Sequence, residues 1–185
     1  LEEVGIMEEI KKIAIPMHGR HIHNADASTA YQPYGNERQF INSVSRGELN
    51  KMLMELAEIN GAEIFFNQKC EKINWKTNEI TFENCINHQL STINYQLTFG
   101  SDGAYSAARL THQLQHDRFQ YHQHYIDFGY KELTIPSGSN GEFMMEKNAL
   151  HIWPRGNYML IALPNMDGSF TCTLFFPFEG EPSFA

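Results

Sequence analysis

The stretch YQLTF-GSDGAYSAAR, residues 95–109, joins a candidate strand to a candidate helix. In YQLTF, apolar residues alternate with polar ones, which is typical of a strand with one buried face. The alanines and arginine after the turn favour a helix start. The glycines permit a sharp turn and a close approach of backbone to a ligand, and the free N–H groups of a helix N-terminus suit a phosphate. On spacing alone, a capped turn in an ordinary α/β unit explains the stretch equally well.

The segments on either side predict both helices and sheet. Apolar residues at helical spacing, a Ser45–Glu48 capping box and a stop at Asn60-Gly61 predict a helix over residues 46–59. The other expected elements are a helix at 1–13, strands at 20–23, 30–35, 40–44 and 63–66, an antiparallel meander at 70–75, 79–82 and 92–99 with a turn at 76–78, and strands at 125–135, 150–153, 158–163 and 170–176. The expected fold class is mixed α/β (α+β), in which α/β sequence is threaded through a larger, mostly antiparallel sheet.

Charge and composition narrow the class of protein. The net charge is −8, and no Lys/Arg cluster exceeds the pair Lys11-Lys12, which disfavours nucleic-acid binding. The longest apolar run, residues 158–163, is too short to span a membrane. Cys70, Cys85 and Cys172 are expected to be reduced, buried thiols of a cytoplasmic protein. The chain starts within a helical pattern, without an initiating Met, so we expect an internal piece of a longer protein.

Nine histidines raise the question of a metal site. His21 and His23, like His122 and His124, are two residues apart and would share one face of a strand. Neither pair has a third ligand at a recognised spacing, so we expect no metal. No Ser/His/Asp nucleophile motif is present either.

Eight short segments together resemble the class A flavoprotein aromatic hydroxylases, and within that class the enzymes that hydroxylate L-kynurenine at ring position 3. The segments are residues 16–20, 32–35, 43–50, 100–109, 129–133, 150–156, 160–165 and 168–171. The resemblance implies part of a Rossmann-like FAD-binding domain (residues 1–17, 44–67 and 92–112) interleaved with part of a mostly antiparallel substrate-binding sheet domain (18–43 and 113–185), with a β-meander at 68–91. The family's N-terminal Gly-rich fingerprint and its C-terminal part have no counterpart in the chain.

The resemblance also implies a substrate site. Arg20 falls where similar enzymes hold the carboxylate of the substrate, and a guanidinium matches a carboxylate bidentately. Tyr34, fixed between Pro33 and Gly35, resembles the phenol that donates to the same carboxylate. The residues that would pack the substrate ring beside the flavin are Ile41, Leu150, Ile161, Leu163 and Phe175. Without the resemblance, such alternating apolar residues indicate ordinary core.

Four further residues resemble the cofactor site. Arg46 falls where the family reaches the phosphate–ribitol side of the flavin, and a cation at a helix N-terminus is otherwise disfavoured, so a nearby anion would explain it. Cys70 would contact the adenine end through its backbone. Asp102 and Gly103 resemble the turn that approaches both the flavin pyrophosphate and the nicotinamide nucleotide.

The resemblance therefore implies an enzyme that uses FAD, NADPH and O2 to hydroxylate L-kynurenine. The flavin carries the chemistry, so no residue of this chain is expected to act as a general acid or base. Two alternatives stay open: a hydroxylase of the same class with another aromatic acid as substrate, and a sheet-based binding module without catalysis. A homodimer is a further expectation.

Overall fold

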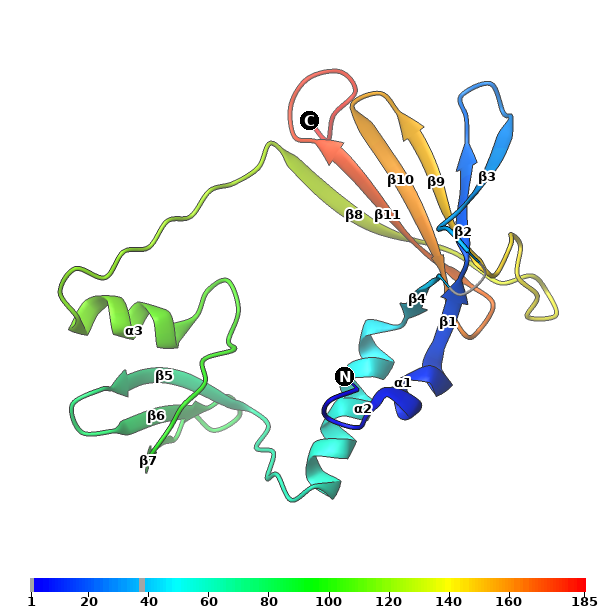
Figure 1. The fold of residues 1–185 in the computed structure, drawn as a ribbon. Helices are drawn as coiled ribbons and strands as arrows, with labels where there is room; N and C mark the ends of the chain where they lie inside the picture. Colours follow the sequence, from blue (N-terminus) through cyan, green and yellow to red (C-terminus); the bar gives the residue numbers. More distant parts are fainter. Residues whose placement is uncertain (1, 37–38) are drawn as a thin grey trace. The chain divides into compact units, whose positions relative to one another are not determined.

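The computed structural model describes residues 2–36 and 39–185, which form two compact units (Figure 1). The first unit comprises the described residues up to Asn60 together with Tyr125–Ala185, and the second comprises Gly61–His124. The boundaries of these units differ from those expected for the FAD-binding and substrate-binding domains. The assignment of residues to those two domains stays a prediction. The mixed α/β class is confirmed.

The first unit is built on a six-stranded sheet with the strand order β3-β2-β9-β10-β11-β8. Its neighbours are antiparallel except β2 and β9, which run parallel. The strands are β2 (Gly19–His23), β3 (Thr29–Pro33), β8 (Phe128–Ile135), β9 (Ala149–Arg155), β10 (Tyr158–Pro164) and β11 (Phe170–Pro177). The hairpin turns expected after β9 and β10 are present, and Gly156 and Gly168 supply the positive φ angles they need.

The two faces of this sheet differ in burial. Because side chains alternate along a strand, Ala162, Phe170 and Cys172 point to one face, where they are buried. Phe143 and Met145, from the segment between β8 and β9, pack against them there. We call the opposite side the open face, because its side chains are only partly buried or exposed.

The rest of the first unit joins short strands to helices. β1 (Ala14–Met17) pairs with β4 (Ile41–Val44), and α1 (Met7–Ile13) leads into β1. α2 (Arg46–Ile59) has the bounds expected from the sequence; Ser45 accepts a hydrogen bond from the Glu48 N–H at 3.4 Å, and Gly61 has a φ of +90°. The helix expected from residue 1 begins only at Met7, and Leu1 lies outside the described residues.

The second unit is the expected antiparallel meander with one helix packed on it. Its strands are β5 (Gln68–Asn74), β6 (Glu79–Asn84) and β7 (Leu90–Asn94), and its helix is α3 (Ala107–Gln115). The turn after β5 uses Asn78 at a φ of 56°. The Gln115 amide of α3 donates to the Ile73 carbonyl of β5 at 2.7 Å, which ties the helix to the sheet.

Two expected strands are wrong. Residues 63–66 and 95–99 are irregular, and no described strand pairs with either segment. The side chains of Phe65, Phe66 and Phe99 are exposed, whereas Tyr95 is partly buried and its ring packs edge-on against Trp75. A strand needs a neighbour for its N–H and C=O groups, and apolar alternation alone cannot supply one.

The cysteines only partly match expectation. All three are free thiols, and Cys172 is buried. Cys70 is partly buried, and Cys85 is exposed because it lies in the turn after β6, so its expected burial is wrong. Among the described residues, no helix is both long and apolar enough to cross a membrane.

Candidate functional site

The open face collects five of the seven expected substrate residues. Arg20 on β2 pairs with Leu150 on β9, so both side chains point to the same side of the sheet. The pairing of β9 with β10 and of β10 with β11 shows which side chains of β10 and β11 point to that same side. The five residues that share the open face are Arg20, Leu150, Ile161, Leu163 and Phe175.

The Arg20 side chain has a hydrogen-bond donor that an anionic ligand could satisfy. Its Nε is buried, and no described atom accepts a hydrogen bond from it. A buried donor without a partner costs about 1–3 kcal/mol, so a ligand that accepts this hydrogen bond would recover that cost. The guanidinium carbon lies 5.5 Å from the ring centre of Tyr34.

Tyr34 is held beside Arg20 by its backbone. Its N–H donates to the His18 carbonyl at 3.1 Å. Burial raises the pKa of the Tyr34 hydroxyl, and the Arg20 charge opposes that rise. The hydroxyl therefore stays protonated near neutral pH and can donate to an acceptor.

Ile41 lies apart from the open face. It belongs to β4, opposite Met17 of β1, and its side chain is exposed. The structure does not bring it to the six-stranded sheet, so its role beside a substrate ring stays a prediction.

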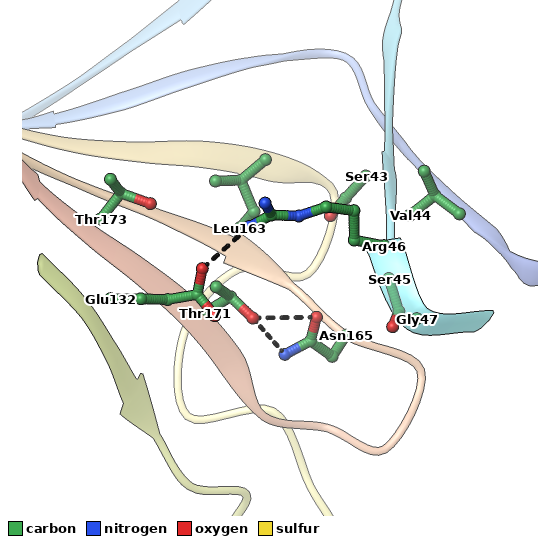
Figure 2. A pocket seen from close by; sticks show the side chains of 10 residues that line it. All are labelled: Ser43, Val44, Ser45, Arg46, Gly47, Glu132, Leu163, Asn165, Thr171 and Thr173. Carbon is green, nitrogen blue, oxygen red and sulfur yellow. Dashed lines mark hydrogen bonds and ion pairs between the residues drawn. The ribbon is translucent and has the colours of Figure 1, made fainter. Parts of the chain in front are cut away.

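A hollow of about 320 Å³ opens where α2 begins (Figure 2). It brings together Arg46, an expected cofactor residue, and Leu163, an expected substrate residue. Arg46 Nη2 donates to Glu132 Oε2 on β8 at 3.1 Å. The lining residues are Ser43, Val44, Ser45, Arg46, Gly47, Glu132, Leu163, Asn165, Thr171 and Thr173.

The Asp102 carboxylate organises the turn of the second unit. It accepts hydrogen bonds from Ser106 Oγ at 2.5 Å and from the Ala108 N–H at 3.1 Å. The bond from Ser106 is the main reason that the pKa of Asp102 is lowered. The Arg109 guanidinium donates to the carbonyls of Gly103 and Ala104 and closes the turn from the other side.

Gly103 leaves room for a ligand at this turn. Its φ is +80°, and a Cβ built there would meet no atom within 4 Å. Asp102 lines two hollows, one shared with Cys70 and the other with Gly103 and Arg109. Burial, reinforced by the Asp102 charge, raises the pKa of the Cys70 thiol, so the thiol is neutral. Three of the four expected cofactor residues therefore gather in the second unit, whereas Arg46 belongs to the first.

His21 and His23, the pair at which the sequence predicted no metal site, lie beside a third histidine, His151, on the buried face of the six-stranded sheet, opposite the open face. His23 Nε2 lies 2.9 Å from His151 Nδ1, and His21 stacks on His151 with ring centres 5.5 Å apart. His151 Nε2 lies 2.9 Å from the Glu146 carbonyl, and burial lowers the pKa of both His23 and His151. Among the described residues, no group of three or more side chains is arranged to hold a metal ion.

The residues that the sequence analysis missed are Glu132 and Thr173. They face each other across β8 and β11, and both line the Arg46 hollow. Because side chains alternate between the faces of a strand, a strand over residues 128–135 predicts that Glu132 shares a face with Tyr130. The neighbouring sequence does not predict the ion pair of Glu132 with Arg46.

The fold is shared with flavoproteins of known structure. Klebsiella pneumoniae HpxO complexed with FAD and uric acid matches with a TM-score of 0.66 and 12% identity, over 95% of this chain and 44% of that chain. A flavoprotein/dehydrogenase from Cytophaga hutchinsonii matches with a TM-score of 0.64 and 15% identity, over 98% of this chain and 44% of that chain. At such identities the likeness concerns the fold alone.

The chain belongs to the family described as FAD binding domain, which matches residues 1–166. Kynurenine 3-monooxygenase of Christiangramia forsetii is 45% identical over 185 residues, and that of Dictyostelium discoideum is 46% identical over 187. These alignments cover 100% of this chain, but only 41% and 40% of the two relatives. The chain thus spans about two fifths of the relatives' length, and the resemblance stated from the sequence is confirmed.

Proposed function

We propose that the full-length protein is an FAD-dependent monooxygenase that hydroxylates L-kynurenine at ring position 3, with NADPH and O2 as co-substrates. The observation that carries this proposal is the open face, where a buried, unpartnered Arg20 Nε lies on the same side as Leu150, Ile161 and Phe175. L-Kynurenine has a carboxylate at one end and an aromatic ring at the other, so it complements such a face. Relatives 45% identical that carry the kynurenine 3-monooxygenase name support the same substrate.

In this proposal Arg20 and Tyr34 bind the carboxylate. The guanidinium offers planar, bidentate hydrogen bonds, and the neutral phenol adds a further donor. The apolar side chains of β9, β10 and β11 hold the ring and exclude water from it. Fixed orientation of the ring is the protein's contribution to the rate of its hydroxylation.

The chain's residues fit part of an FAD site. Arg46 with the first turn of α2 would face the phosphate–ribitol side, the open backbone at Gly103 would approach the pyrophosphate, and the Cys70 backbone would contact the adenine end. FAD, when bound and reduced by NADPH, supplies the oxygen-transfer chemistry. The side chains described above bind and orient, and none of them needs to transfer a proton.

The proposal is tested by incubating the full-length protein with L-kynurenine and NADPH and identifying the product by mass spectrometry. We expect one added oxygen at ring position 3 and the absorbance of a bound flavin. Omission of NADPH is the control. Bound flavin with hydroxylation of another aromatic acid in place of kynurenine would support the alternative hydroxylase, and absence of flavin would support a binding module.

We also propose a cytoplasmic location. The three free thiols support it, because disulfides are rare in reducing compartments. Homodimerisation stays a hypothesis that sedimentation of the full-length protein would decide.

A further inference from the structure

The ion pair between Arg46 and Glu132 connects two distant parts of the first unit (Figure 2). Arg46 is the first residue of α2, where the helix dipole disfavours a cation. Glu132 comes from the edge strand β8, and its Oε2 lies 3.1 Å from Arg46 Nη2. The carboxylate thus offsets an unfavourable placement of the arginine.

This pair is too exposed to matter much for folding. The Arg46 side chain is 84% exposed and that of Glu132 is 53% exposed. Exposed ion pairs contribute at most about 1 kcal/mol to stability. A role in stability is therefore a poor explanation for the contact.

The position of Glu132 points to the binding site instead. Glu132 is paired with Thr173, and Thr173 is paired with Ile161, so all three side chains lie in one row across the open face. Arg46, Glu132 and Thr173 also line one hollow. The pair therefore stands at the edge of the face that the proposed substrate ring occupies.

The pair leaves most of the guanidinium available. Arginine has five N–H donors, and the described residues engage one of them, through Glu132. A guanidinium held at one corner keeps its remaining donors for an anionic ligand. The carboxylate thereby fixes the direction of the arginine without occupying it.

We propose that Glu132 is a positioning residue that aims Arg46 at the flavin. This rests on the proposed FAD-dependent function and extends it. Glu132 acts only through Arg46, so its removal should weaken FAD binding when Arg46 is present and have no effect when Arg46 is absent.

The test is a double-mutant cycle in the full-length protein, with the FAD dissociation constant measured by quenching of flavin fluorescence on titration of the apoprotein. We expect Glu132→Gln to raise that constant by about threefold to tenfold, since one orienting, charge-assisted contact is lost. In an Arg46→Gln background the same change should have no further effect. Glu132→Asp, which keeps the charge, should restore most of the affinity.

Two controls accompany the cycle. Lys131→Gln removes a charge from the same strand on the opposite face and should leave FAD affinity unchanged. Glu132→Thr, a second charge-removing change with high strand propensity, is measured in parallel so that the result does not depend on one variant folding.

An unchanged dissociation constant for both Glu132→Gln and Glu132→Thr, or an equal effect with and without Arg46, would overturn the proposal. A full-length protein that binds no FAD at all would instead refute the proposed function. The two failures are therefore distinguishable.

Discussion

At the scale of single residues, the two arginines of the proposed site differ in burial, and this difference changes what each guanidinium needs from a ligand. Arg20 has a buried Nε without a described acceptor, so its donor is costly until a ligand accepts from it. Arg46 is almost fully exposed and already held by Glu132. We therefore expect the proposed substrate carboxylate to depend on Arg20, and the proposed flavin to meet Arg46 at a more exposed position.

Arg20→Lys in the full-length protein should weaken kynurenine binding much more than FAD binding. A point charge replaces a bidentate fork, which costs roughly 1.5–3 kcal/mol, or about tenfold to a hundredfold in affinity. Titration of the oxidised flavoprotein with kynurenine measures this. Arg118→Lys, at an exposed site of the second unit, is the matched control, and equal kynurenine affinity in both variants would remove Arg20 from the site.

The same residues show what local sequence could and could not predict. The composition of residues 20–34 allows an anion site, but only the resemblance singled out Arg20 with Tyr34. The contact between Arg46 and Glu132 spans 86 positions and depends on β8 pairing with β11. No local pattern specifies such a pairing, which is why Glu132 was missed.

At the scale of elements, prediction succeeded where local signals agree with the packing. α2 has a cap, a periodic apolar face and a glycine stop, and its bounds match the prediction. Residues 63–66 and 95–99 have only apolar character in common with strands, and neither pairs with a described strand. Alternating apolar residues indicate that one face of a segment can be buried, whereas a strand also requires a neighbouring strand for its backbone hydrogen bonds.

Ser106→Ala should loosen the start of α3. Ser106 Oγ accepts a hydrogen bond from the Arg109 N–H at 2.9 Å and donates one to the Asp102 carboxylate. The hydroxyl therefore both caps the helix and stabilises the preceding turn. Loss of such a cap costs about 1 kcal/mol. Faster amide hydrogen exchange across residues 107–111 of the full-length protein is the expected readout, and Ser101→Ala, in an exposed part of the same turn, should leave exchange unchanged.

The histidine cluster between β2 and β9 should make stability depend on pH. The pKa of His23 and of His151 is lowered below the ordinary value of 6.5, so the unfolded chain binds more protons than the folded one. Stability is therefore complete above about pH 6.5 and falls as pH drops below it. Burial is the main cause at both residues; repulsion by His151, His21 and Arg155 lowers the pKa of His23 further, repulsion by His21 lowers that of His151, and Glu146 opposes the change at His151.

Thermal melts of the full-length protein between pH 8 and pH 5 test this expectation. His23→Gln removes one titrating group and keeps a hydrogen-bonding amide, so its melting temperature should fall less steeply with acidification. His124→Gln is the control, because His124 is exposed in the second unit. Identical pH slopes for wild type and His23→Gln would assign the acid sensitivity to other groups.

At the scale of the whole molecule, both units carry large apolar side chains that are exposed. Phe65, Phe99, Tyr125 and Ile126 are among the large side chains that are more than two thirds exposed. Its relatives are more than twice as long, and the sequence contains no Gly-rich dinucleotide fingerprint of the G-x-G-x-x-G type. Both the flavin site and the apolar surfaces are therefore expected to need partners beyond these residues.

The 185-residue chain on its own should self-associate and retain no stoichiometric FAD. In the proposed function, Arg46, Gly103 and the Cys70 backbone supply only part of a flavin site, so we expect binding not to overcome the entropic cost of association. Exposed apolar surface should meanwhile drive copies together. Light scattering after size exclusion and flavin absorbance after desalting measure the two effects, and a Phe65→Ser, Phe99→Ser variant should associate less because it removes two of the exposed rings. A monodisperse monomer that keeps one FAD would show that these residues form a complete and self-sufficient site.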